Sequence, residues 1–123
     1  MNKSMERGVQ QKRFAIAELQ KRIEVLEATR EDLERQIRKL TDSVPEEEVD
    51  LNAHKEGYVS YGSYARSVID RKKNLRVSLE DIQTQHASLA DDLRLALDAL
   101  DSFERVRARQ IAHEAEKKLK RAR

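Results

Sequence analysis

The fold is decided by one stretch, residues 9–44, which reads VQQKRFAIAELQKRIEVLEATREDLERQIRKLTDSV. Apolar side chains recur in it every seven residues, at two positions that lie three residues apart. The first position holds Val9, Ile16, Ile23, Arg30, Ile37 and Val44, and the second holds Lys12, Leu19, Leu26, Leu33 and Leu40. Isoleucine at the first position with leucine at the second favours two-stranded packing in parallel coiled coils. The stretch therefore predicts a long amphipathic helix over residues 5–43.

Two residues near the start of this helix depart from the pattern. Gly8 costs about 1 kcal/mol relative to alanine in a helix interior, which predicts fraying before Val9. Phe14 lies outside both heptad positions, so we expect it to be exposed and to offer a weak contact to a partner.

A second heptad repeat begins at Tyr61 and predicts a helix over residues 61–120, roughly 90 Å long at about 1.5 Å per residue. One position holds Tyr61, Val68, Leu75, Ile82, Leu89, Ala96 and Phe103, and the other holds Ala65, Lys72, Leu79, His86, Leu93 and Leu100. After Leu100 a four-residue step is inserted, which locally unwinds a left-handed supercoil. The apolar stripe then continues through Ala108, Ile111, Ala115, Leu119 and Ala122.

The residues that break helices gather between the two repeats. Pro45, Gly57 and Gly62 are three of the four Gly and Pro residues in the chain. We therefore expect a connection over residues 44–60, with a capping box at Ser43 and a short helix near 46–53. Residues 1–123 are expected to form a single all-α domain, a long two-helix antiparallel coiled-coil hairpin.

Pairing the two helices about this connection places Ile16 opposite Leu89 and Ile37 opposite Val68. The first helix then ends near residue 101 of the second, so residues 101–123 are expected to form a C-terminal helical overhang. Eight basic and four acidic residues give this segment a net charge of +4, which leaves −2 for residues 1–100.

The composition excludes most other classes of protein. The 123 residues include three Gly, one Pro and no Cys or Trp, and Ala, Glu, Lys, Leu and Arg make up 65 of them. Sheets joined by tight turns need more Gly and Pro, whereas this composition is typical of long helices. No run of about 18 apolar residues and no secretory signal is present, so we expect a cytoplasmic protein without membrane insertion.

No residue pattern points to catalysis, a metal or a cofactor, so we expect a protein that is not an enzyme. The chain has no cysteine and no Gly-rich phosphate loop. Its three histidines, His54, His86 and His113, stand apart, and His86 is expected to be a tolerated polar residue of the heptad repeat. Glu46–Glu48 are expected to be an acidic helix start, because adjacent residues of a helix point in different directions.

Two segments are candidate partner-binding surfaces. Tyr58, Tyr61 and Tyr64, with Val68, gather near the predicted hairpin end; they either cover the end of the coil or anchor a protein interface. The overhang carries an apolar stripe with no partner in the predicted hairpin, and such a stripe usually binds another protein; the other interpretation is a solvated charged tail. Its candidate contact residues are Arg105, Arg107, Arg109, Ile111, Lys117, Lys118, Leu119 and Lys120.

Three stretches carry a resemblance to the FliJ family of flagellar type III export proteins: QQKRFAIAEL (residues 10–19), YGSYARSVIDRKKNL (61–75) and IAHEAEKKL (111–119). The resemblance covers nearly the whole chain. It implies a non-enzymatic stalk, similar in shape to the central stalk of rotary ATPases, located in the cytoplasm at the flagellar base. It also implies three kinds of partner, namely the hexameric export ATPase at the overhang, the cytoplasmic domain of the export gate at the tyrosine-rich end, and export chaperones.

Two other functions remain open from the residues alone. A coiled-coil arm that binds nucleic acid could use the basic overhang, and such binding would weaken steeply with salt. The charge of −2 over residues 1–100 and the lack of interleaved Arg and aromatic residues disfavour it. The other alternative is a homodimeric coiled-coil scaffold.

Overall fold

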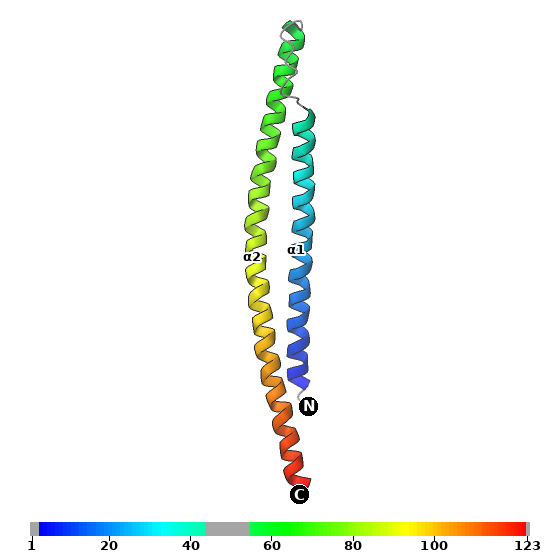
Figure 1. Cartoon of the computed structure of the whole chain (residues 1–123), viewed down its shortest axis with the longest axis vertical. Coiled ribbons are helices and arrows are strands. Elements are labelled where there is room, and N and C mark those ends of the chain that lie inside the picture. Colours follow the sequence, from blue (N-terminus) through cyan, green and yellow to red (C-terminus); the bar gives the residue numbers. More distant parts are fainter. Residues whose placement is uncertain (1–2, 44–54, 123) are drawn as a thin grey trace. The chain divides into compact units, whose positions relative to one another are not determined.

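The computed structural model describes residues 3–43 and 55–122, and the side chains of all of these except residues 55–61. The described residues form two helices, α1 (Lys3–Ser43) and α2 (Lys55–Ala122). The helices pack against each other as a hairpin (Figure 1), which confirms the predicted all-α fold class.

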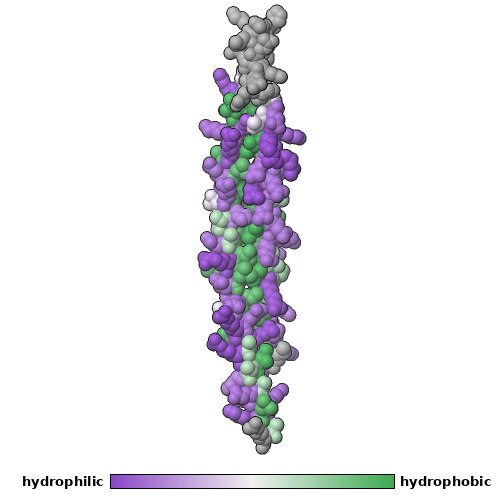
Figure 2. Space-filling view, in the orientation of Figure 1, coloured by the Kyte–Doolittle hydropathy of each residue, from purple (hydrophilic) through white to green (hydrophobic). Residues whose placement is uncertain are grey.

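The hairpin divides into two units, each of which pairs a segment of α1 with a segment of α2. Unit 1 contains residues 1–24 and 87–123, and unit 2 contains residues 25–86. The buried apolar residues are Val9, Ile16 and Leu89 in unit 1, and Val68 and Ile82 in unit 2. All five occupy predicted heptad positions. In each unit the apolar surface is a narrow strip bordered by polar side chains (Figure 2), as expected where only two helices cover each other.

The helix boundaries differ from the prediction mainly at the start of α2. This helix begins at Lys55, six residues before the predicted start, and it includes both Gly57 and Gly62. Nothing lies within 4 Å of the position that a Cβ atom of Gly62 would take, so no packing contact requires a glycine there. A helix of 68 residues tolerates the cost of about 1 kcal/mol per glycine. The rest of the predicted connection, with its short helix over 46–53, lies outside the described residues.

The expected fraying before Val9 is wrong, because Gly8 makes a close contact between the helices. A Cβ atom added to Gly8 would lie 2.6 Å from Cζ and 3.1 Å from Cε1 of Phe103. The ring of Phe103 therefore packs in the space that the missing side chain leaves. Lys12 Nζ lies 5.2 Å from the centre of the same ring, within the range of a cation–π interaction. Contacts from α2 thus hold the first turns of α1, and α1 begins at Lys3.

We expect Gly8→Ala to destabilise the protein, although alanine is the better helix former. The helix gains about 1 kcal/mol, but displacing the Phe103 ring costs more, since overpacking costs roughly 1–3 kcal/mol. In a Phe103→Ala background the ring is absent, so the same substitution is expected to stabilise by about 1 kcal/mol. Urea unfolding of the four proteins in this cycle measures the coupling, and an equal effect of Gly8→Ala in both backgrounds would contradict the packing argument.

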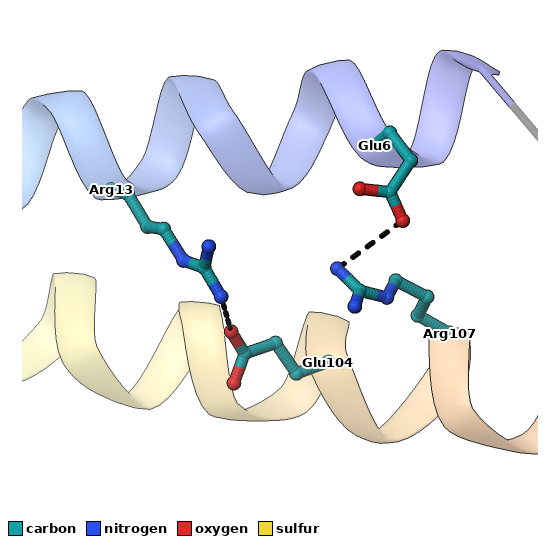
Figure 3. Close-up of polar contacts among 4 residues, drawn as sticks. All are labelled: Glu6, Arg13, Glu104 and Arg107. Atoms are coloured by element: carbon teal, nitrogen blue, oxygen red, sulfur yellow. Dashed lines mark hydrogen bonds and ion pairs between the residues drawn. The ribbon is translucent and has the colours of Figure 1, made fainter.

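In unit 1 and at Glu27 of unit 2, the pairing of the two helices is displaced from the expected register by roughly one heptad. In unit 1, Glu6 contacts Arg107 and Arg13 contacts Glu104 (Figure 3), whereas the expected register places residue 99 opposite Glu6. In unit 2, Glu27 contacts His86, whereas the expected register places residue 78 there. The expected pairing of Ile16 with Leu89 is therefore wrong, and that of Ile37 with Val68 stays a prediction.

The displacement is smaller at the end of α1, where the expected register places residue 62 opposite Ser43. The hydroxyl of Tyr64 donates a hydrogen bond to Ser43 Oγ at 3.3 Å, so the last residue of α1 lies beside Tyr64. Nine residues of α2 precede this point. In unit 1 the contacts with α1 reach Arg107 instead of ending near residue 101, because the ring of Phe103 fits against Gly8 and Arg107 pairs with Glu6.

Candidate partner-binding surfaces

The overhang of α2 comprises residues 108–122, and every one of them is exposed. In unit 1 this part of α2 continues past the start of α1, towards the C-terminus (Figure 1). Ile111 is 45% exposed and Leu119 is 66% exposed. Both belong to the apolar stripe of the overhang, whose other members are Ala108, Ala115 and Ala122. The spacing of three or four residues places these side chains along one side of the helix. The described part of the chain therefore leaves this apolar stripe uncovered, as predicted.

Two of the predicted contact residues lie before the overhang. The guanidinium of Arg107 lies 3.3 Å from Glu6 Oε1, across the hairpin. Arg105 lies 3.0 Å from Asp101, one turn earlier on the same helix. The prediction that Arg107 belongs to a free overhang is therefore wrong, because its side chain joins α2 to α1. Such partly or fully exposed pairs contribute less than about 1 kcal/mol each to stability.

The cations of the overhang itself are more accessible. Lys120 lies 4.0 Å from Glu116 within the helix. Arg109, Lys117 and Lys118 are exposed and form no ion pair with any described residue. Residues 108–122 contain five basic and two acidic residues, a net charge of +3. A surface of one sign attracts acidic partners over a distance that salt shortens. The overhang thus combines an apolar stripe with an excess of positive charge.

The structure places the second predicted surface only in part. Tyr58 and Tyr61 lie in the first turns of α2, and their side chains are outside the described part of the structure. Tyr64 is half exposed, and its hydroxyl bonds to Ser43 of α1. Val68 is only 5% exposed, so its prediction as a partner contact is wrong. It is a heptad residue of unit 2, and its side chain is buried in the hairpin.

Other residues singled out in the sequence have simple positions. Phe14 is 68% exposed, which confirms the expected exposure. His86 is half buried, and its Nε2 lies 3.2 Å from Glu27 Oε1, so a hydrogen bond satisfies this polar heptad residue. His113 is exposed, and His54 lies outside the described residues. Among the described residues, no group of three or more His, Asp or Glu side chains could hold a metal ion, and neither helix is apolar enough over a sufficient length to cross a membrane.

The sequence analysis missed one contact between the helices and one charged segment of the surface. The contact of Gly8 with Phe103 could not be predicted without knowing how the two helices are aligned. The charge of residues 1–100, which sums to −2, hides a strongly basic segment over residues 66–76 of α2, where five cations stand against one acidic residue. Counting charge in short windows, instead of over the whole predicted hairpin, would have revealed this segment.

The comparisons with known proteins assign no family to the chain. No protein-family model, no curated protein sequence and no solved structure matches it.

Proposed function

We propose that this protein is a non-enzymatic stalk or adaptor of a flagellar type III export apparatus. In this function the overhang docks into the hexameric export ATPase, while the tyrosine-rich start of α2 contacts the cytoplasmic domain of the export gate. Handling of export chaperones and a location in the cytoplasm at the flagellar base belong to the same proposal. Its basis in the sequence is the resemblance of residues 10–19, 61–75 and 111–119 to the FliJ family.

The observation that carries the proposal is the exposed overhang. A helix with an uncovered apolar stripe is marginal in water, because most helical stability in proteins comes from packing. Ile111 and Leu119 are large and exposed, and they lie on the same side of the helix about two turns apart. They can therefore anchor the overhang on a helix or in a groove of a partner. The net charge of +3 favours a partner with an acidic or mixed-charge surface.

The proposal is tested by co-purification of the export ATPase from flagellated cells with the full-length chain. The double variant Ile111→Asp/Leu119→Asp is expected to weaken this association at least tenfold, a loss of about 1.4 kcal/mol or more, because it places two carboxylates in the apolar contact. Association of the unaltered protein is expected to weaken as salt is raised, since the cations steer the encounter.

Leu95→Asp is the matched control for this experiment. Leu95 lies on the same helix, is 59% exposed and is outside the overhang, so this variant is expected to retain the ATPase. Undiminished association of the Ile111→Asp/Leu119→Asp variant would exclude the overhang as the docking element. If the unaltered protein does not retain the ATPase and instead binds a labelled nucleic acid duplex in a salt-sensitive way, the nucleic-acid-binding arm is favoured.

A further inference from the structure

The described side chains of unit 2 separate into a basic half and an acidic half. The basic half, residues 35–43 and 62–76, contains eight basic and two acidic residues, a net charge of +6. The acidic half, residues 25–34 and 77–86, contains one basic and six acidic residues, a net charge of −5. The contacts of Ser43 with Tyr64 and of Glu27 with His86 show that the two segments of each half lie beside each other. All of these charged residues except Lys72 are exposed.

Ion pairs among the described residues of unit 2 neutralise little of this charge. Arg30 lies 3.9 Å from Glu34, and Arg35 lies 3.8 Å from Asp32, both near the limit of an ion pair. The five cations of residues 66–76 form no ion pair with any described residue. Like charges also recur one helical turn apart, as at Lys72 and Arg76, and such pairs destabilise a helix. Each half therefore favours contact with a surface of the opposite charge.

An exposed apolar residue lies at the boundary between the two halves. Val77 is 60% exposed and stands midway between the heptad residues Leu75 and Leu79, so it points away from α1. Lys73 lies one turn before Val77 and Asp81 one turn after it, on the same face of α2. Along the helix, this face of α2 thus carries a basic, then an apolar and then an acidic side chain.

We propose that unit 2 binds unit 2 of a second copy of this chain, side by side and antiparallel, with Val77 near the two-fold axis. In such an isologous contact, residue i of one copy meets residue j of the other, and residue j meets residue i. A two-fold axis at Val77 brings Lys73 of each copy opposite Asp81 of the other, and places each basic half beside an acidic half. The two Val77 side chains then cover each other.

Charge complementarity favours a second copy over other occupants. A nucleic acid or a uniformly acidic protein would be attracted by the basic half and repelled by the adjacent acidic half, whereas a second copy satisfies both, since +6 and −5 nearly balance. The contact is narrower than a general scaffold function, because it assigns one face and one orientation. It uses no residue of the overhang, so it is independent of the proposed ATPase contact.

The test is sedimentation velocity of the full-length chain over a range of protein concentrations. We expect a dimer at about 0.01 M salt, where the Debye length is about 30 Å, and dissociation at about 1 M, where it is about 3 Å. The basic-side variant Lys73→Glu/Arg76→Glu and the acidic-side variant Glu80→Lys/Asp81→Lys should each weaken self-association at least tenfold. Each substitution changes an exposed residue, and circular dichroism verifies that the helices are retained.

The decisive sample is the equimolar mixture of the two charge-reversed variants. Their altered residues are complementary and their unaltered halves still match, so the mixture should form a dimer that neither variant forms alone. Asp91→Lys/Asp92→Lys is the matched control, because it makes the same change of charge at exposed residues of unit 1 and should not weaken the dimer. A monomer at low salt, or a mixture that does not dimerise, would overturn the proposal. The proposal would also be overturned if the chain did not self-associate but bound an acidic protein or a nucleic acid duplex, and only the basic-side variant lost that binding.

Discussion

Truncation after Arg107 is expected to leave the melting temperature within about 2 °C of the full-length value, whereas truncation after Leu100 should lower it by roughly 10 °C. The first truncation removes residues 108–122, all of them exposed, together with the final residue of the chain. The second also removes Phe103, whose ring packs against Gly8, and Arg107, which pairs with Glu6. Val9 follows Gly8 directly and is fully buried, so we expect it to lose part of its cover as well.

The size of the difference follows from the apolar contacts. Uncovering Val9 and removing the Phe103 contact cost together about 3 kcal/mol, since a buried apolar side chain contributes about 1.5–3 kcal/mol. Truncation after Leu100 also breaks two ion pairs, Arg13 with Glu104 and Arg107 with Glu6. Both are partly exposed and therefore contribute little to stability. Thermal unfolding followed by circular dichroism measures both proteins under the same conditions.

The same two proteins separate folding from partner binding. If the proposed function is right, the chain ending at Arg107 keeps a folded hairpin and loses the export ATPase, because it lacks Ile111 and Leu119. Equal melting temperatures for the two truncated proteins would show that the contacts between residues 101–107 and α1 contribute nothing, which would contradict the register described here. Retention of the ATPase by the chain ending at Arg107 would contradict the docking proposal alone.

Heptad spacing predicted which residues are buried but could not predict how the helices are aligned. Val9, Ile16, Val68, Ile82 and Leu89 are all buried heptad residues. A seven-residue repeat, however, looks the same after a shift of seven residues, so several registers cover the same apolar positions equally well. The choice among them depends on features that do not repeat. Gly8 fits the ring of Phe103, and Glu6 and Arg13 find partners of opposite charge on α2.

The start of α2 was predicted wrongly because the sequence analysis treated each glycine by itself. Gly57 and Gly62 are helix-destabilising residues when each is considered alone. In the structure they belong to one helix with the long repeat that follows, and extending an existing helix is easier than nucleating one. The sequence therefore indicated where helix breakers gather, but it did not indicate which of them end a helix.

The candidate surfaces were predicted with unequal success. The apolar stripe of the overhang could be predicted because its spacing and its lack of a partner follow from helix length alone. The start of the overhang could not, since it depends on the register, and Arg107 consequently belongs to the hairpin. The sequence analysis predicted both heptad packing and a partner contact for Val68. The side chain is buried, so only the packing prediction is confirmed.

Ile16→Asp is expected to destabilise the protein by more than about 3 kcal/mol, whereas Phe14→Asp should change its stability by less than about 0.5 kcal/mol. The two residues are large, apolar and only two positions apart on α1, but Ile16 is 7% exposed and Phe14 is 68% exposed. An aspartate at position 16 loses the burial of the isoleucine and places a carboxylate in the apolar interior of unit 1. An aspartate at position 14 remains in water.

Urea unfolding of both variants at neutral pH measures the difference. The Ile16→Asp protein is expected to lose much of its helical signal even without denaturant, because a narrow two-helix interior has few other apolar contacts with which to compensate. Similar losses for the two variants would mean that Phe14 is covered in solution, for example by a second copy or another protein. Similar small effects would mean that residues 3–24 of α1 do not depend on packing against α2. The described contacts of Gly8, Arg13 and Glu6 with α2 argue against that second outcome, because all three lie in the same segment of α1.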